Sequence, residues 1–240
     1  MRKFTVLSAA VVLVTTAGIA SPAAAQEHHG GAARGHHGAP HHRTHQSSNW
    51  AGYVAGGTHK TVVTTWVNPE VDCSTRGIVS WWDGIDGQDS NTVEQIGVDA
   101  NCESGSLRYE PWYELYPQDS VYFDEPTDAG DTMTATTAYD GGHRYTMTLA
   151  DSTKGWSKTF HGTASGDQDV DAEVIVEAIG SGDIPPCPDF GTVSFSQTTV
   201  DDRAFAEYGP GRTDLVREDT PLTATGDLNG GDFSVRWLHS

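Results

Sequence analysis

The feature that most constrains the fold is a series of short stretches rich in Thr, Val, Tyr and Trp, starting at Ser47 and interrupted by Gly or Pro roughly every 8 to 12 residues. β-Branched and aromatic residues favour strands, whereas Gly and Pro end them. Long periodic stretches of Leu, Ala, Glu and Lys, which would indicate helices, are missing. The expected strands are 61–67, 79–82, 93–98, 107–116, 132–139, 144–150, 156–161, 172–179, 192–200, 222–226 and 233–238.

This many short strands in one unit predicts an all-β fold, a β-sandwich of two antiparallel sheets packed face to face. A chain of 240 residues with 36% hydrophobic residues and 27 Gly has a composition close to the globular norm, so it can bury a core. One domain with appendages fits this length, and no internal repeat is visible. No oligomer signal is visible either, and we expect a monomer.

The charge balance excludes some partners. The chain has 33 acidic and 14 basic side chains, a net charge of −19, and only four of the basic residues are Lys. Because nucleic-acid phosphates and anionic lipid surfaces are held by Lys and Arg, we expect neither as a partner.

The first 25 residues are expected to be a signal peptide. Arg2 and Lys3 precede an uncharged, mostly apolar stretch over 4–20, and three Ala residues, 23–25, supply the small side chains that a signal peptidase requires. No other stretch approaches the about 20 apolar residues of a membrane span. We therefore expect cleavage after Ala25 and a secreted, extracellular protein whose thiols meet an oxidising environment.

Residues 26–46 differ from both neighbours, since they hold seven of the 11 His among Gly, Ala and Gln. We expect a disordered tail or propeptide ahead of a domain over 47–240. Metal capture by the paired His residues is an alternative. A pH-dependent prosegment is another, because 1–46 holds four basic and one acidic side chain, which leaves 10 basic and 32 acidic side chains, net −22, in 47–240.

Several catalytic signatures are missing: H-E-x-x-H, G-x-S-x-G, the phosphate-binding P-loop and the Asp-Thr/Ser-Gly of paired-aspartate proteases. The cysteines lack the spacing of a metal knuckle or a redox pair. We pair Cys73 with Cys102, which would close a loop of roughly 30 residues and stabilise it by about 3 to 4 kcal/mol. Cys187 is left over, and a buried or capped thiol is favoured over a nucleophile.

Strand alternation predicts which side chains share a face. Gln95 and Asp99 are expected on one face of their strand, with Ile96 and Val98 on the other. Trp112, Glu114 and Tyr116 fall together, so that two aromatic residues and an acid could line a groove. Glu177 lies between Ile175 and Ile179 and would be partly desolvated, which raises the pKa of a carboxyl group. Plain alternatives exist: a solvent-facing amide, a surface carboxylate and ordinary core or edge aromatics.

Seven segments in one order give these residues a context: NWAGYV (49–54), TWVNP (65–69), WDGIDG (82–87), VEQIGVD (93–99), YEPWYELYP (109–117), AEVIVEA (172–178) and DFGTVSF (189–195). Together they resemble the glutamic peptidases, or eqolisins, in their bacterial secreted form. The resemblance covers residues 47 to about 200. It implies a sandwich of two bent antiparallel sheets, of the concanavalin-like or jelly-roll type, with a groove across the concave face. It also implies an acid-active endopeptidase that works without metal or cofactor.

The resemblance also implies roles for individual residues. The catalytic glutamine corresponds to Gln95 and the catalytic glutamate to Glu177. The implied groove positions are Trp82, Asp86, Asp99, Glu114 and Tyr116, and strand alternation adds Trp112. The chain departs from the family pattern in three places: Val174 replaces a Trp, Asp83 replaces an apolar residue and Cys187 is extra. Val174 should face away from Glu177, whereas Asp83 should add a negative charge near the groove.

Peptide hydrolysis follows from these roles. Glu177 would act as general base on water and then as general acid, and Gln95 would position the water and stabilise the oxyanion. The expected partners are protein or peptide substrates. Two alternatives remain: a glycosidase that uses Glu114 and Glu177, with Trp82 and Trp112 stacked on sugars, and a non-catalytic module that binds peptide or glycan.

Overall fold

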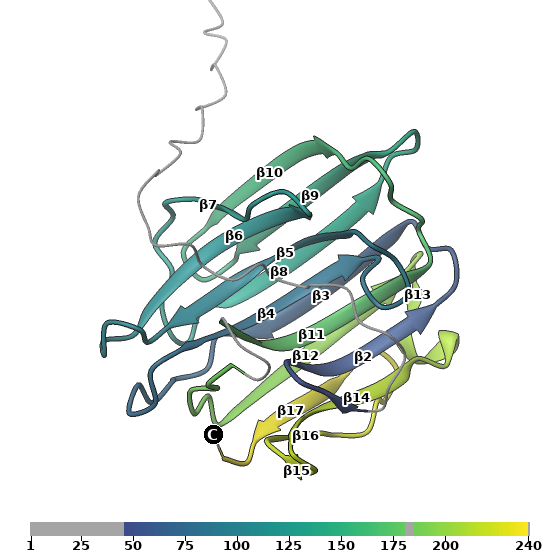
Figure 1. Ribbon diagram of the computed structural model, residues 1–240. Coiled ribbons are helices and arrows are strands. Elements are labelled where there is room, and N and C mark those ends of the chain that lie inside the picture. Colours follow the sequence, from purple (N-terminus) through teal and green to yellow (C-terminus); the bar gives the residue numbers. More distant parts are fainter. Residues whose placement is uncertain (1–45, 181–184, 240) are drawn as a thin grey trace, which may run out of the picture.

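Two stacked β-sheets make up the fold (Figure 1). The structure is a computed structural model that describes residues 46–180 and 185–239. Nearly all strand pairs are antiparallel, and the one short helical segment in these residues is the 3₁₀ turn η1 (Phe205–Tyr208). The predicted β-sandwich is confirmed.

The first sheet holds the strands that matter for the site. Its order is β1 (Gln46–Ser47), β14 (Gly211–Arg217), β2 (Trp50–Gly56), β11 (Asp171–Ile179), β4 (Ile78–Ile85), β5 (Val93–Asn101), β6 (Arg108–Tyr116) and β7 (Val121–Tyr122), with β15 (Thr220–Pro221) paired to β14. Strands β11, β4 and β5 are therefore direct neighbours, although β11 begins about 80 residues farther along the chain than β5.

The second sheet backs the first (Figure 1). Its order is β10 (Trp156–Thr163), β9 (Arg144–Asp151), β8 (Thr132–Tyr139), β3 (Thr61–Val67), β12 (Thr192–Val200), β17 (Phe233–Trp237) and β16 (Thr223–Thr225), with β13 (Arg203–Ala204) paired to β12. Strands β3 and β8 alternate buried and partly exposed residues, as expected for strands with one solvated face.

The first sheet is packed on both faces. Strands β4, β5 and β11 are buried at every position. Alternate residues of these strands belong to two different apolar clusters, one shared with the second sheet and one built from the first sheet alone. We call the face toward the second sheet the inner face and the opposite face the outer face.

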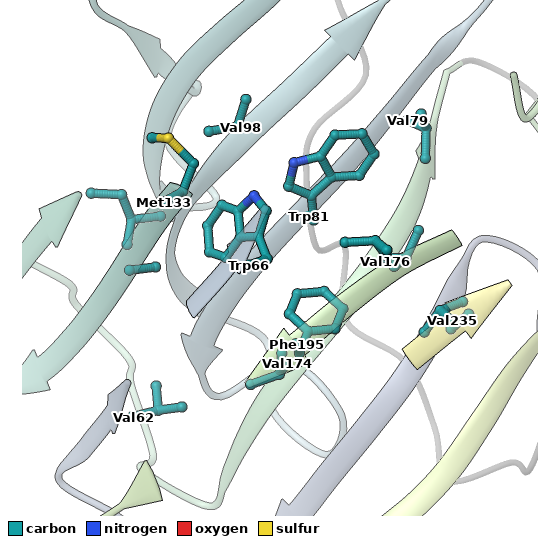
Figure 2. Close-up of a cluster of buried hydrophobic side chains, with 14 of the residues drawn as sticks. Val62, Trp66, Val79, Trp81, Val98, Met133, Val174, Val176, Phe195 and Val235 are labelled. Atoms are coloured by element: carbon teal, nitrogen blue, oxygen red, sulfur yellow. The ribbon is translucent and has the colours of Figure 1, made fainter. Parts of the chain in front are cut away.

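The inner-face core is shown in Figure 2, where Trp66 of the second sheet lies close to Trp81 of the first. The two indole Nε1 groups both donate to Asn68 Oδ1, at 2.8 and 3.0 Å, so one amide oxygen satisfies two buried donors. Each large apolar side chain buried here contributes about 1.5 to 3 kcal/mol of transfer free energy. Val174 also lies in this core, on the opposite face from Glu177, as predicted.

Every expected strand is present, and 61–67, 132–139 and 192–200 have the observed bounds. Two seven-residue strands of the first sheet, β2 and β14, were not predicted, nor were its two-residue strands β1, β7 and β15. β2 has the sequence WAGYVAG, in which Ala and Gly lower the strand propensity, and β14 carries Arg and Asp in GRTDLVR. Both strands form because the sheet pairs them, β2 with β11 and β14 with β2.

Asp83 lies elsewhere than expected. It is on the inner face of β4, fully buried, and accepts a hydrogen bond of 2.9 Å from the Thr137 hydroxyl of the second sheet. The prediction that its charge lies near the groove was wrong, because alternation along β4 turns Asp83 toward the core while Trp82 faces outward. Burial raises the pKa of Asp83 well above its ordinary range, which favours the protonated, neutral form.

Glu94 occupies an equivalent position on β5. It is fully buried, and neither carboxyl oxygen has a hydrogen-bond partner in the described part of the chain. Burial, and then the charges of Asp86 and Asp167, raise the pKa of Glu94 to about 9.

The cysteines follow the expected arrangement. Cys73 and Cys102 form a disulfide with a Cα–Cα distance of 5.1 Å. Cys187 is a buried free thiol, and burial raises its pKa to about 12, which fits an inert side chain.

Two expected segments fall outside the described residues: the signal peptide over 1–25 and, except for Gln46, the His-rich segment over 26–46. Within residues 46–180 and 185–239, no helix has the length and apolar character needed to cross a membrane.

The buried acids predict a stability that falls with rising pH. A carboxyl group whose pKa is higher in the folded state than in the unfolded state stabilises fully below the unfolded pKa and loses this contribution as pH rises through the folded pKa. For Glu94 that window runs from about pH 4.5 to about 9. The free energy of unfolding from urea titrations should therefore decrease between pH 5 and 8, and Glu94→Gln should flatten this slope.

The exposed Glu103 provides the matched control. Glu103→Gln should leave the wild-type slope unchanged. A wild-type stability that is constant or rises from pH 5 to 8 would contradict the assignment of neutral acids to the core.

Candidate active site

Gln95 is held on the outer face of β5 by its neighbours in the sheet. It pairs with Glu114 on β6 and with Gly84 on β4. Its Nε2 donates to Glu114 Oε2 at 2.9 Å, while its Oε1 has no hydrogen-bond partner among the described residues. The side chain is fully buried, so the alternative of a solvent-facing amide was wrong.

Glu177 projects from β11 to the same face. Asn49 Nδ2 donates to its Oε1 at 2.7 Å, and Trp82 Nε1 donates to its Oε2 at 3.0 Å. Each carboxyl oxygen thus receives a donor that never ionises, an arrangement that orients a carboxylate. Glu177 is also fully buried, which excludes the alternative of a surface carboxylate.

Trp82 links the two groups. On β4 it lies two residues from Ser80, which pairs with Glu177, and two residues from Gly84, which pairs with Gln95. Strand β4 runs between β5 and β11 (Figure 1). The Trp82 indole lies on the outer face of β4, where its Nε1 bonds to Glu177. Its ring packs edge-on against Trp50 at a centroid distance of 5.1 Å.

The indole can lie there because Gly97 faces it from β5. A Cβ built on Gly97 would approach Trp82 Cβ and the Trp81 carbonyl oxygen to 2.5 Å each. Any larger residue at this position would therefore push β4 and β5 apart. The glycine of the VEQIGVD segment is explained by this close contact.

Other expected groove residues extend this face. Asp99 Oδ2 accepts a hydrogen bond of 2.8 Å from the Tyr122 hydroxyl. Trp112 Nε1 donates to Ser80 Oγ at 3.1 Å, and Tyr116 packs against the same outer cluster. The predicted grouping of Trp112, Glu114 and Tyr116 by alternation is thus what the sheet shows.

Asp86 has a different surrounding. It lies just after β4 in a left-handed conformation, φ 68°. Its carboxylate accepts the backbone N–H groups of Gln168, Asp169 and Val170 at 2.7 to 3.1 Å, and the Thr92 hydroxyl at 3.2 Å. Asp86 therefore bonds to the loop before β11 and not to Gln95 or Glu177.

Three residues near the site were not singled out from the sequence. Asn49 and Ser80 contact Glu177 and Trp112 through long-range pairing, which no local pattern reveals. Glu173 could have been found, because on β11 it shares the parity of Glu177 and therefore the outer face.

Within residues 46–180 and 185–239, no group of three or more His, Cys, Asp or Glu side chains is arranged to hold a metal ion. The site residues themselves are an amide, a carboxyl group and indoles. Such a set can take a proton from water and donate N–H bonds to a developing negative charge.

The chain matches the Peptidase A4 family over residues 48–237. Among solved structures, it is similar to scytalido-glutamic peptidase with a transition state analog inhibitor, at 21% identity and a TM-score of 0.68, covering 79% of this chain and 98% of that one. SCP-B, an eqolisin in complex with the tripeptide Ala-Ile-His, is 20% identical, with a TM-score of 0.64 and coverages of 79% and 98%.

Aspergilloglutamic peptidase from Aspergillus niger is 28% identical, with a TM-score of 0.54, and the match covers 67% of this chain and 99% of that one. No curated protein sequence matches the chain significantly.

The contact between Gly97 and Trp82 yields a stability prediction. Gly97→Ala should lower the free energy of unfolding by about 1 to 3 kcal/mol or more, because the added methyl group meets backbone atoms that cannot rotate away. Urea titration at pH 5 measures the loss. Gly211→Ala is the matched control, since Gly211 is also in a strand and a Cβ there would meet only the Val54 carbonyl oxygen, at 3.9 Å. Equal stabilities of the two variants would contradict the packing described.

Proposed function

Since the chain belongs to the peptidase A4 family, the glutamic peptidases, we propose that this peptidase is a secreted, acid-active endopeptidase whose catalytic dyad is Gln95 and Glu177. The positions of the two side chains support this assignment of the dyad. The amide and the carboxyl group project from separate strands to one face of one sheet, on either side of Trp82.

Glu177 is the proposed general base and acid. Its two oxygens are oriented by Asn49 and Trp82, so the carboxylate can take a proton from an attacking water without first changing rotamer. Such proton transfer contributes roughly 10² to 10⁴ in rate. Once protonated, Glu177 returns the proton to the departing amine.

Gln95 is the proposed oxyanion group. A primary amide has two N–H donors, and one of them is directed to Glu114. This bond fixes which end of the amide carries the donors and leaves the second N–H for the oxyanion that develops on the peptide carbonyl. Removal of one such donor typically costs roughly 10² to 10³ in kcat.

The surrounding face supports a peptide substrate. Trp82, Trp112 and Tyr116 form an apolar cluster on this face, while Asp99 and Ser80 supply polar groups. SCP-B binds a tripeptide in its solved complex. Membership of a peptidase family sets aside the glycosidase and the non-catalytic binding module, and Glu114, which the glycosidase would need, is bonded to Gln95.

Secretion and acid activity are proposed from the sequence. Secretion is inferred from the proposed signal peptide over 1–25. Acid activity agrees with a net charge of −19, because repulsion among surface carboxylates fades as they protonate.

The dyad is tested by Glu177→Gln and Gln95→Ala. Each variant should keep the wild-type circular dichroism spectrum and lose at least about 10²-fold in kcat/KM on a fluorogenic peptide at acid pH, because each lacks a group acting in the transition state. Glu110→Gln is a control on the same sheet, since Glu110 is partly exposed and bonds to Asn101. Near-wild-type turnover by either dyad variant would refute the assignment.

A further inference from the structure

Glu173 is an acid on the outer face that the proposed dyad does not use. It lies on β11, four residues before Glu177, and points to the same face. Its side chain is fully buried, and no donor among the described residues reaches either carboxyl oxygen. An ionised carboxyl group buried without donors is costly, so this position favours the protonated acid.

Its position relates it directly to Gln95. Glu114, Gln95, Gly84 and Glu173 form one row across β6, β5, β4 and β11. Gly84 has no side chain to separate its neighbours. A Cβ built there would lie 2.9 Å from Glu173 Oε1 and 3.2 Å from Gln95 Cβ, so the side chains of Glu173 and Gln95 both lie against Gly84.

The charges that act on Glu173 all belong to acids: Asp171 on its own strand, Asp86 after β4 and, from the opposite face of the sheet, Glu94 on β5. Burial, and then the charge and hydrogen bond of Asp171, raise the pKa of Glu173 well above its ordinary range. Asp171 accepts the backbone N–H groups of Gln88 and Asp89 at 3.3 Å each. Burial raises the pKa of Asp171 as well, but the hydrogen bonds from Glu173, Gln88 and Asp89 oppose that rise. The pKa of Glu173 is raised further, which favours Glu173 as the group that holds the proton between the two carboxyl groups.

The dyad alone does not explain acid activity. It contains one titratable group, Glu177, which acts as a base when ionised. Such a site would gain activity as pH rises and then stay active toward neutrality. Activity confined to acid requires a second group that works in its protonated form.

We propose that Glu173 is this second group, a positioning residue that must keep its proton for Gln95 to act. The proposal rests on the proposed function. When neutral, Glu173 leaves the second N–H of Gln95 free for the substrate. When ionised, it would attract that N–H and place a negative charge beside the developing oxyanion. At an effective dielectric constant of about 20, a like charge at about 6 Å slows the reaction roughly 100-fold.

The test is the pH profile of kcat/KM on a fluorogenic peptide, measured for the secreted protein. In Glu173→Gln, the new side chain has nearly the shape of the protonated acid and stays uncharged at every pH. Its activity at the optimum should stay within about tenfold of wild type, its low-pH limb should not move, and its high-pH limb should shift upward by at least about one pH unit. Glu103→Gln, which removes an exposed charge, should superimpose on wild type.

Asp171→Asn should move the same limb in the opposite direction, because it removes the charge that keeps the proton on Glu173. It also decides the matter if Glu173→Gln does not fold. An unmoved or upward-shifted limb in Asp171→Asn would overturn the proposal. So would a folded Glu173→Gln whose high-pH limb coincides with wild type, or which is inactive at every pH.

A purely structural role would change the melting temperature of Glu173→Gln and leave its high-pH limb in place, which also contradicts the proposal. A wild-type protein whose kcat/KM does not fall at high pH would also contradict the proposal. None of these outcomes touches the dyad, which fails separately if Glu177→Gln or Gln95→Ala remains active.

Discussion

Every part of the site depends on the alternation of side chains along β4, β5 and β11. Because successive residues point to opposite faces, the same strands bury Trp81, Val98 and Val174 against the second sheet and present Trp82, Gln95 and Glu177 on the outer face. A shift of pairing by one residue would exchange these sets and place the amide and the acid in the core. The interlocked inner core of Trp66, Trp81 and Asn68 therefore fixes the register from which the site follows.

Buried acids with raised pKa values distinguish the first sheet. Asp83 and Glu94 are buried on its inner face and Glu173 on its outer face, and burial raises the pKa of each. A protein working in acid keeps such groups protonated at little cost, whereas at neutral pH each would have to hold its proton against the solvent. Fold and chemistry would then share one condition: the pH that keeps the core uncharged also keeps Glu173 neutral beside Gln95.

Much of this could be predicted from the sequence, because strands reveal themselves by local composition and alternation assigns their faces. The β-sandwich, the position of Val174 and the grouping of Trp112, Glu114 and Tyr116 all followed from such patterns. The disulfide followed from a choice among three cysteines, of which Cys73 and Cys102 lie in loops that flank the predicted site strands. Strands β2 and β14 did not, since their residues favour strands weakly and pairing alone orders them. Alternation along β4 places Asp83 on the inner face, but the prediction placed its charge near the groove. The hydrogen bond of Asn49 to Glu177 joins residues 128 positions apart, which no local pattern encodes.

The central claim is that Gln95 and Glu177 act together on one scissile peptide bond. The most direct measurement is a crystal structure of the protein bound to a peptide whose scissile bond is replaced by a tetrahedral phosphinate. The account predicts one phosphinate oxygen within hydrogen-bond distance of Gln95 Nε2 and the other within hydrogen-bond distance of a Glu177 carboxyl oxygen. A peptide that binds on the outer face with its phosphinate out of reach of either side chain, or that binds elsewhere on the molecule, would contradict it.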